Sequence, residues 1–288
     1  MAKILVMTDS TCDLPADWVR QYDVRIVPTY VQFGLESLAD DGVQLTRPAF
    51  YQRLTASQHL PTTAAPPLGQ AVDVLTKALQ DADHVVAITA PALLSGIHSI
   101  FKLAAEQTDP ARVTVIDSQM VSMGLGWQVV EACQMAQQGA SPEDIRARLV
   151  AMQPLTDVYA ALDTFEYLRR SGRVGWAAAI LGGFLQVKPL IRLHMSVVSS
   201  QGRVRTRERA FEALVALVHE VAPLSRLAVL HTANPQAAQR LAQAIEDIYP
   251  PDSPVPIVEV TPVIGVHVGP NALGFGIVRA EQPNSTAD

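Results

Sequence analysis

The sequence predicts an α/β protein, because short apolar strands alternate with segments of helical spacing over most of its 288 residues. In the N-terminal half, the strand-like runs are rich in Val and Ile and too short for helices. We expect strands at residues 3–7, 24–33, 84–89 and 112–116, and helices at 47–54, 68–79, from Ile97 and from Gly124. This alternation is typical of a parallel sheet, so residues 1–155 are predicted to form an N-terminal parallel α/β domain.

The composition changes after Pro154, and residues 156–280 are predicted to form a second, C-terminal α/β domain. Strand-like runs again alternate with segments of helical spacing. We expect strands at 157–162, 227–231, 257–260 and up to 278, a helical turn at 166–170, helices at 174–185, 210–221 and 236–248, a hairpin from 190–199 with its turn at 201–202, and a glycine-rich turn at 262–274. The polar residues 281–288 are expected to be a disordered tail.

The composition favours a globular protein of the cytoplasm. Hydrophobic residues make up 49% of the chain and charged residues 17%, which supplies enough apolar area for two cores. A formal net charge of -6 without a long Lys/Arg run argues against nucleic acid or an anionic membrane surface as the main partner. Cys12 and Cys133 suggest neither a disulfide framework nor a zinc site. The sequence has no signal-peptide layout and no uncharged run suited to cross a bilayer.

Several motifs of common enzymes are missing from the sequence. It has no G-x-S-x-G elbow, no Walker lysine after a glycine, no H-E-x-x-H and no C-x-x-C. Asp9 could be interpreted as a phosphatase nucleophile, but Thr11 stands where that class has its second aspartate. The carboxylates and hydroxyls of residues 8–15 are better interpreted as helix caps and loop contacts. We therefore expect a binding protein without catalytic residues, metal or cofactor.

The strongest candidate for an anion site follows the predicted strand at 84–89. Pro91 ends this strand, and Leu94, Ser95 and Gly96 lead into apolar residues at helical spacing. Ser95 is therefore predicted at a helix N-terminus, where free N–H groups and the helix dipole attract an anion and Gly96 allows close approach. The alternative is that Ser95 only caps its helix, which is the commoner role of a serine there.

Two further segments bear on the kind of ligand. Residues 60–67 combine prolines with Thr62 and Thr63, which predicts a rigid loop lined with hydroxyls. The predicted helix at 174–185, just after Arg173, is apolar nearly all round and is typical of a buried helix or of one that lines a hydrophobic cavity. The sequence thus offers a ligand hydroxyl groups, one histidine in a glycine-rich loop and a surplus of apolar surface.

Seven short motifs occur in a fixed order from Lys3 to about Val278. They are TDSTCDLP at 8–15, PTTAAP at 61–66, LSG at 94–96, VIDS at 115–118 with MGLG at 123–126, FEYLRRSGRV at 165–174, VKPLI at 187–191 and PVIGVHVGP at 262–270. Together they resemble the DegV family of bacterial fatty-acid-binding proteins. The resemblance implies two α/β domains of the DegV type with the lipid held between them. It also implies a non-catalytic subunit that presents a long-chain fatty acid to a separate fatty acid kinase for acyl-phosphate formation.

The resemblance implies which side chains bind the fatty-acid carboxylate. Thr63 matches the threonine of the family's T-S-Q-P loop, and Ser95 with Gly96 matches its L-S-G-T turn. His267 matches the histidine of the G-T-H-T-G-P-G loop, and Arg173 matches an arginine implied to contact the kinase. At most positions where this sequence departs from the family's motifs, it has an apolar residue, so a drier head-group pocket or a different lipid is expected. The departures are Ala64, Ala65, Ile97, Val266 and Val268 in place of polar residues, and Asn271 in place of a glycine. Around Arg173, Ser171 and Val174 also depart from the family's G-G-R-I segment.

The acyl tail would lie in a tunnel lined by the helix at 174–185, through Ile180, Leu181 and Phe184. Two other classes stay open. His267 could bind a small carbonyl compound, as a histidine does in the similar domain of dihydroxyacetone kinases, although the apolar helix argues against a small polar substrate. The third class is a lipid-responsive regulator that contacts other proteins.

Overall fold

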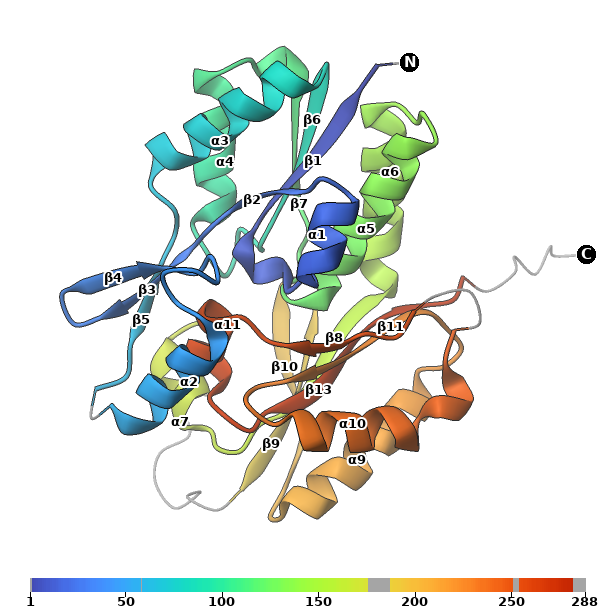
Figure 1. Ribbon diagram of the computed structural model, residues 1–288. Helices are drawn as coiled ribbons and strands as arrows, with labels where there is room; N and C mark the ends of the chain where they lie inside the picture. Colours follow the sequence, from blue (N-terminus) through green and yellow to red (C-terminus); the bar gives the residue numbers. More distant parts are fainter. Residues whose placement is uncertain (1, 58, 176–186, 251–253, 282–288) are drawn as a thin grey trace, which may run out of the picture.

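The computed structural model describes residues 2–57, 59–175, 187–250 and 254–281, and it has a mixed α/β fold (Figure 1). The strands of these residues form three sheets. Their strand orders are β2-β1-β6-β7, β10-β9-β8-β13-β11-β12 and β4-β3-β5. The α/β class that the alternation of strands and helices predicts is therefore confirmed.

The four-stranded sheet is parallel throughout and comes from the first part of the chain. Its strands are β1 (Ile4–Asp9), β2 (Arg25–Val27), β6 (His84–Thr89) and β7 (Val113–Asp117). One face is covered by α3 (Leu68–Asp81) and α4 (Ile97–Gln107), the other by α5 (Met123–Gln137) and α6 (Pro142–Met152). The carboxyl ends of β1 and β6 lie side by side at the edge where α/β sheets commonly bind ligands.

The six-stranded sheet is mixed and comes from the second part of the chain. Its strands are β8 (Thr156–Ala161), β9 (Lys188–His194), β10 (Val197–Val204), β11 (Leu224–His231), β12 (Ile257–Glu259) and β13 (Leu273–Arg279). All neighbours pair antiparallel except β11 and β12. Helices α9 (Arg207–Glu220) and α10 (Pro235–Ala244), followed by η4 (Glu246–Ile248), cover one face, where Tyr159 stacks on Phe275.

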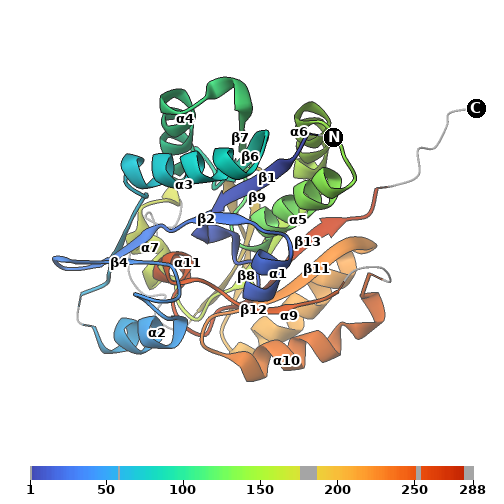
Figure 2. The same cartoon turned by 45° about the horizontal axis from the view of Figure 1, so that its top comes forward.

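Helix α5 lies between the two large sheets and contacts both (Figure 2). Its Trp127 is fully buried, and the indole Nε1 donates a hydrogen bond of 3.1 Å to the carbonyl oxygen of Gly276 in β13. One hydrophobic cluster runs from Val6 and Val86 in the parallel sheet, through α5, to Leu193 in the mixed sheet. The two sheets therefore share a core through this helix.

The small antiparallel sheet projects from one side of the molecule (Figure 1). It consists of β3 (Tyr30–Phe33), β4 (Glu36–Ala39) and β5 (Thr62–Ala64). Helices α2 (Arg47–Ala56) and α11 (Pro262–Val268) pack against it around Val31, Phe50 and Val266, and α7 (Glu166–Ser171) lies beside α11. This cluster joins residues from both halves of the chain. The remaining short helices are η1 (Ser10–Cys12), α1 (Ala16–Gln21), η2 (Pro110–Arg112) and η3 (Gln153–Leu155).

Two predicted β elements are wrong in detail. Residues 24–33 form two strands in different sheets, because Pro28 has no N–H to continue a ladder. The hairpin of β9 and β10 turns at Met195 and Ser196, with φ of 45° and 67°, while the expected turn residue Gly202 lies at a bulge within β10. Neither Met nor Ser is a residue that marks such a turn, so this turn could not be predicted from local residue types.

Residues 262–268 are helical, and the prediction of a glycine-rich turn is wrong at this point. Pro262 occupies the first turn of α11, where proline is favoured. Gly265 is required by packing, because a Cβ there would lie 2.6 Å from Cε1 of Phe50. Gly269 ends the helix with a φ of 75°. The glycines thus serve the packing and the end of a helix.

The predicted apolar helix at 174–185 lies almost entirely outside the described residues, as do its Ile180, Leu181 and Phe184. Residues 282–288 of the predicted tail also lie outside them. Of the helices that are described, none has both the length and the apolar composition needed to cross a membrane.

Candidate functional site

A cavity of about 330 Å³ lies where the three sheets meet. The five candidates from the sequence that the structure describes all line it: Thr63, Ser95, Gly96, Arg173 and His267. They come from β5, the loop after β6, the residues after α7, and α11. A mostly apolar cavity with a few convergent polar groups is the usual form of a small-molecule site.

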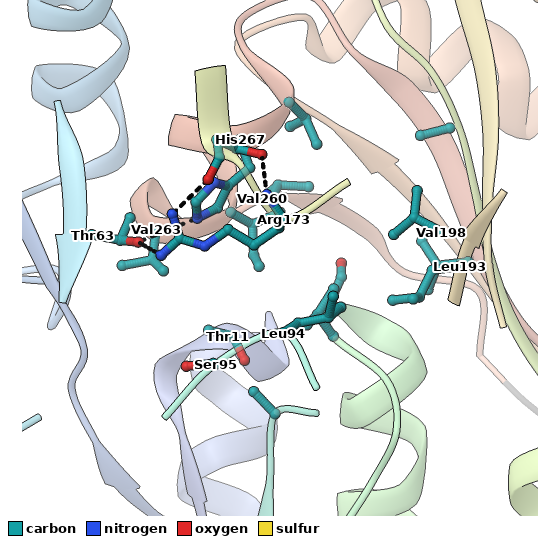
Figure 3. Close-up of a pocket in the computed structure, with 18 of the residues that line it drawn as sticks. Thr11, Thr63, Leu94, Ser95, Arg173, Leu193, Val198, Val260, Val263 and His267 are labelled. Atoms are coloured by element: carbon teal, nitrogen blue, oxygen red, sulfur yellow. Dashed lines mark hydrogen bonds between the residues drawn. The ribbon is translucent and has the colours of Figure 1, made fainter. Parts of the chain in front are cut away.

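One polar side of the cavity is formed by Thr63, Arg173 and His267, which point toward one another (Figure 3). Nε2 of His267 lies 3.3 Å from Oγ1 of Thr63, and Nη2 of Arg173 donates to the same oxygen at 3.5 Å. Nη1 of Arg173 also donates to the carbonyl oxygen of Ser171 at 2.7 Å. Arg173 is exposed and follows Gly172, whose φ of 69° ends α7. The site thus holds one cation at its rim.

His267 is held in its neutral form by its surroundings. Burial lowers its pKa to about 4, and the charge of Arg173 acts in the same direction. Its Nδ1 is buried and has no hydrogen-bond partner within the described part of the chain. A neutral imidazole has one donor and one acceptor nitrogen, so the contact of Nε2 with Thr63 leaves one nitrogen of this ring without a partner.

Ser95 lies on the opposite side of the cavity, next to Thr11 and Leu94 (Figure 3). Gly96, the next residue, also lines the cavity. Helix α4 begins at Ile97 with Gly96 as its N-cap, and Oγ of Ser95 accepts a hydrogen bond of 3.3 Å from the Ile97 N–H. This contact leaves the hydroxyl hydrogen of Ser95 available, because a hydroxyl can donate while it accepts. The helix-cap role of Ser95 is therefore compatible with a role in binding an anion.

The loop after β1 closes the floor of the cavity through Thr11. Oδ1 of Asp9 accepts from N and Oγ1 of Thr11 at 3.0 and 2.5 Å, and Oδ2 accepts from the Ala90 N–H at 2.8 Å. Asp9 is the N-cap of η1, which confirms the interpretation of this residue as a cap.

The inner face of the six-stranded sheet forms an apolar wall that was not predicted. It is made of side chains that alternate along neighbouring strands: Val158, Ala160, Ile191, Leu193, Val198 and Leu230. The alternation of β8 is visible in the sequence, but which of its faces is covered by helices depends on the tertiary structure. The long apolar wall means that most of a bound ligand would be hydrocarbon.

His231 also lines the cavity and was missed in the sequence. Its Nδ1 accepts a hydrogen bond of 3.3 Å from the Asn234 N–H, and burial lowers its pKa to about 4. A single histidine at the end of a strand carries no motif that could have identified it. Within the described residues, no group of His, Cys, Asp and Glu side chains could hold a metal ion.

Comparisons with known proteins agree on one family. The family model described as "Uncharacterised protein, DegV family" matches residues 3–280. A DegV domain-containing protein of Deinococcus radiodurans is 33% identical over 278 residues, which cover 95% of this chain and 98% of the relative.

Solved structures give the same result. A DegV family protein from Thermus thermophilus, described by its fatty acid binding, is 32% identical with a TM-score of 0.87, covering 96% of this chain and 99% of that one. DegV from Bacillus subtilis, described as a fatty acid binding protein, is 28% identical with a TM-score of 0.84 and the same coverage.

Proposed function

This chain belongs to the DegV family, and from that premise we propose that it binds a long-chain fatty acid in the cavity between its three sheets. The observation that carries the proposal is the pairing of a long apolar wall with a small set of polar groups. In this proposal the carboxylate is bound by Thr63, His267, Ser95 and Gly96. The structures from Thermus thermophilus and Bacillus subtilis, both described as fatty acid binding, support the choice of ligand.

The chemistry of the polar groups suits a carboxylate. A buried carboxylate requires hydrogen-bond donors, since an unpaired one would carry a large desolvation penalty. The Ser95 hydroxyl, the N-terminus of α4 and the hydrogen-bonded pair of Thr63 and neutral His267, which has one hydrogen left to donate, can supply donors without a buried cation. Arg173, at the rim, adds attraction while its own charge stays hydrated.

The acyl tail would lie along the apolar face of the six-stranded sheet. In this proposal the lipid is held between the N-terminal domain, residues 1–155, and the C-terminal domain, residues 156–280. Ile180, Leu181 and Phe184 of the predicted helix at 174–185 are proposed to line the tunnel as well, and they lie outside the described residues. Val174, which is buried and lines the cavity, marks where this segment begins. The apolar face of the six-stranded sheet is thus proposed to be one wall of the tunnel.

We further propose that the protein is the non-catalytic, acyl-carrying subunit of a bacterial fatty acid kinase system in the cytoplasm. Its partner kinase would phosphorylate the bound carboxylate at the rim where Arg173 is exposed. A guanidinium can contact a phosphate through two hydrogen bonds, which suits this position. Mixing the lipid-loaded protein with the kinase and ATP should form acyl phosphate. Either protein alone with ATP should form no acyl phosphate.

Native mass spectrometry of the purified protein tests the ligand directly. We expect a co-purified mass of acyl-chain size that is released on denaturation. An apoprotein that also fails to take up added oleic acid would contradict fatty acid binding and would favour a small-carbonyl enzyme. A lipid-loaded protein that no kinase can use would favour the lipid-responsive regulator.

A further inference from the structure

Helix α11, which carries His267 in its last turn, is not capped by its own sequence. Thr261 is its N-cap residue but makes no side-chain cap hydrogen bond within the described structure. Instead, Oδ1 of Asp13 accepts from the Thr261 N–H at 2.8 Å, and Oδ2 of Asp40 accepts from the Val263 N–H at 3.2 Å. Two carboxylates from distant parts of the chain therefore replace the local cap.

Both carboxylates are fixed by further contacts. Oδ2 of Asp13 accepts from Oγ of Ser122, at the start of α5, at 2.5 Å. Oδ2 of Asp40 also accepts from Oγ of Ser10, at 3.3 Å. The start of α11 is thus tied to the loop after β1, to the end of β4 and to α5.

The arrangement has an energetic cost that a simple cap would avoid. Asp13 and Asp40 are only 1% and 5% exposed, and burial raises the pKa of both, that of Asp40 to about 7. A hydroxyl cap at Thr261 could satisfy a backbone N–H without burying a carboxylate. The two acids therefore do more here than complete one helix terminus.

The rest of α11 leaves little freedom in how it can lie. A Cβ on Gly265 would be 2.6 Å from Cε1 of Phe50, and Oη of Tyr51 donates to the carbonyl oxygen of Val260 at 3.0 Å. At the far end, His267 reaches Thr63. A shift at the start of this seven-residue helix would be transmitted to the imidazole, because the helix is short and packed on both sides.

We propose that Asp13 and Asp40 are positioning residues that hold α11 so that His267 meets Thr63 in the cavity. The role of His267 in lipid binding rests on the proposed function, but its placement by the two acids does not. Asp13 belongs to the TDSTCDLP segment, from which Thr11 lines the cavity.

Substitution of Asp40 tests the proposal. Asp40→Ala removes the acceptor, whereas Asp40→Asn retains an oxygen that can accept from Val263. Asp41→Ala is the matched control, because exposed Asp41 accepts, among the described residues, from the N–H groups of Val43 and Gln44 in its own turn. The readouts are the imidazole NMR signals of His267 in lipid-free protein, assigned with His267→Gln, and the Kd for oleic acid by calorimetry.

We expect Asp40→Ala to shift the His267 signals and to raise the Kd for oleic acid by roughly 3- to 30-fold. Asp40→Asn should keep the His267 signals and the Kd for oleic acid close to those of the wild type. Asp41→Ala should change neither the signals nor the Kd. If Asp40→Ala does not fold, Asp40→Ser, whose shorter side chain cannot span the same distance, takes its place.

Unchanged His267 signals in the folded Asp40→Ala protein would overturn the proposal, whatever happens to its stability or its Kd. A wild-type protein that binds no oleic acid would contradict the proposed function instead. The His267 signals in lipid-free protein would still decide the positioning role in that case.

Discussion

Replacing His267 with glutamine should reduce the loss of stability that the protein suffers in acid. The pKa of His267 is about 4 in the folded protein, mainly because of burial, and near the ordinary 6.5 in the unfolded chain. Between these values the unfolded chain binds more protons, so the free energy of unfolding rises with pH. The stabilising contribution of neutral His267 is therefore complete above about pH 6.5 and is lost as the pH falls toward 4.

The size of this effect follows from the difference between the two pKa values. A gap from 6.5 to about 4, at 1.36 kcal/mol per unit, corresponds to about 3 kcal/mol in total. Roughly 2 kcal/mol of this should be lost between pH 7.5 and pH 5. Because part of the ring faces a cavity that water can enter, the measured loss should lie at about 1 to 2 kcal/mol.

Other buried groups titrate in the same range but are present in both proteins. The pKa of His231 is lowered to about 4, so it acts in the same direction as His267. Asp40 acts oppositely: its raised pKa of about 7 gives stability that is present at low pH and lost as the pH rises through 7. The difference between wild type and His267→Gln cancels both contributions and isolates His267.

Urea unfolding, followed by tryptophan fluorescence at pH 7.5 and pH 5, provides the measurement. His219→Gln is the control, because the Val215 carbonyl and Asp247 raise the pKa of this exposed histidine. The control should not protect the protein from acid. If wild type and His267→Gln lose the same free energy between the two pH values, the imidazole is not held neutral by burial.

Three further substitutions test the site. Ser95→Ala should weaken fatty acid binding by about 1 to 3 kcal/mol in a titration with little change in melting temperature, and lost stability with normal binding would leave only the cap role. Arg173→Ala should lower acyl-phosphate formation more than lipid binding, with partial recovery in Arg173→Lys, and undiminished phosphorylation at limiting carrier would exclude the kinase contact. Gly269→Ala should destabilise the protein by about 1 to 3 kcal/mol in urea unfolding, because the φ of Gly269 is 75° and a Cβ there would lie 2.2 Å from Cδ2 of Tyr167. Unchanged stability would contradict this geometry.

Local signals in the sequence were sufficient for the α/β class and for much of the parallel sheet. Short runs of Val and Ile between turn residues predict β1, β6 and β7 to within about two residues, because a fully buried strand needs little beyond such a run. The helix after Ser95 was also predictable, since its apolar residues recur at helical spacing. The same signals failed at Met195 and Ser196, whose conformation is imposed by the pairing of β9 and β10.

The candidate polar residues could be named from motifs, but their meeting could not be derived from the sequence. Thr63 and His267 are 204 positions apart, and Asp13 and Thr261 are 248 positions apart. No periodicity or cap rule extends over such separations, because those rules describe contacts within one element. Sequence alone thus determined many of the elements, including most of the parallel sheet, and the chemical groups available to a ligand. Only tertiary packing decided that α11 lies against β5, that the inner face of the six-stranded sheet is an apolar wall, and that two buried aspartates hold the start of the helix that carries His267.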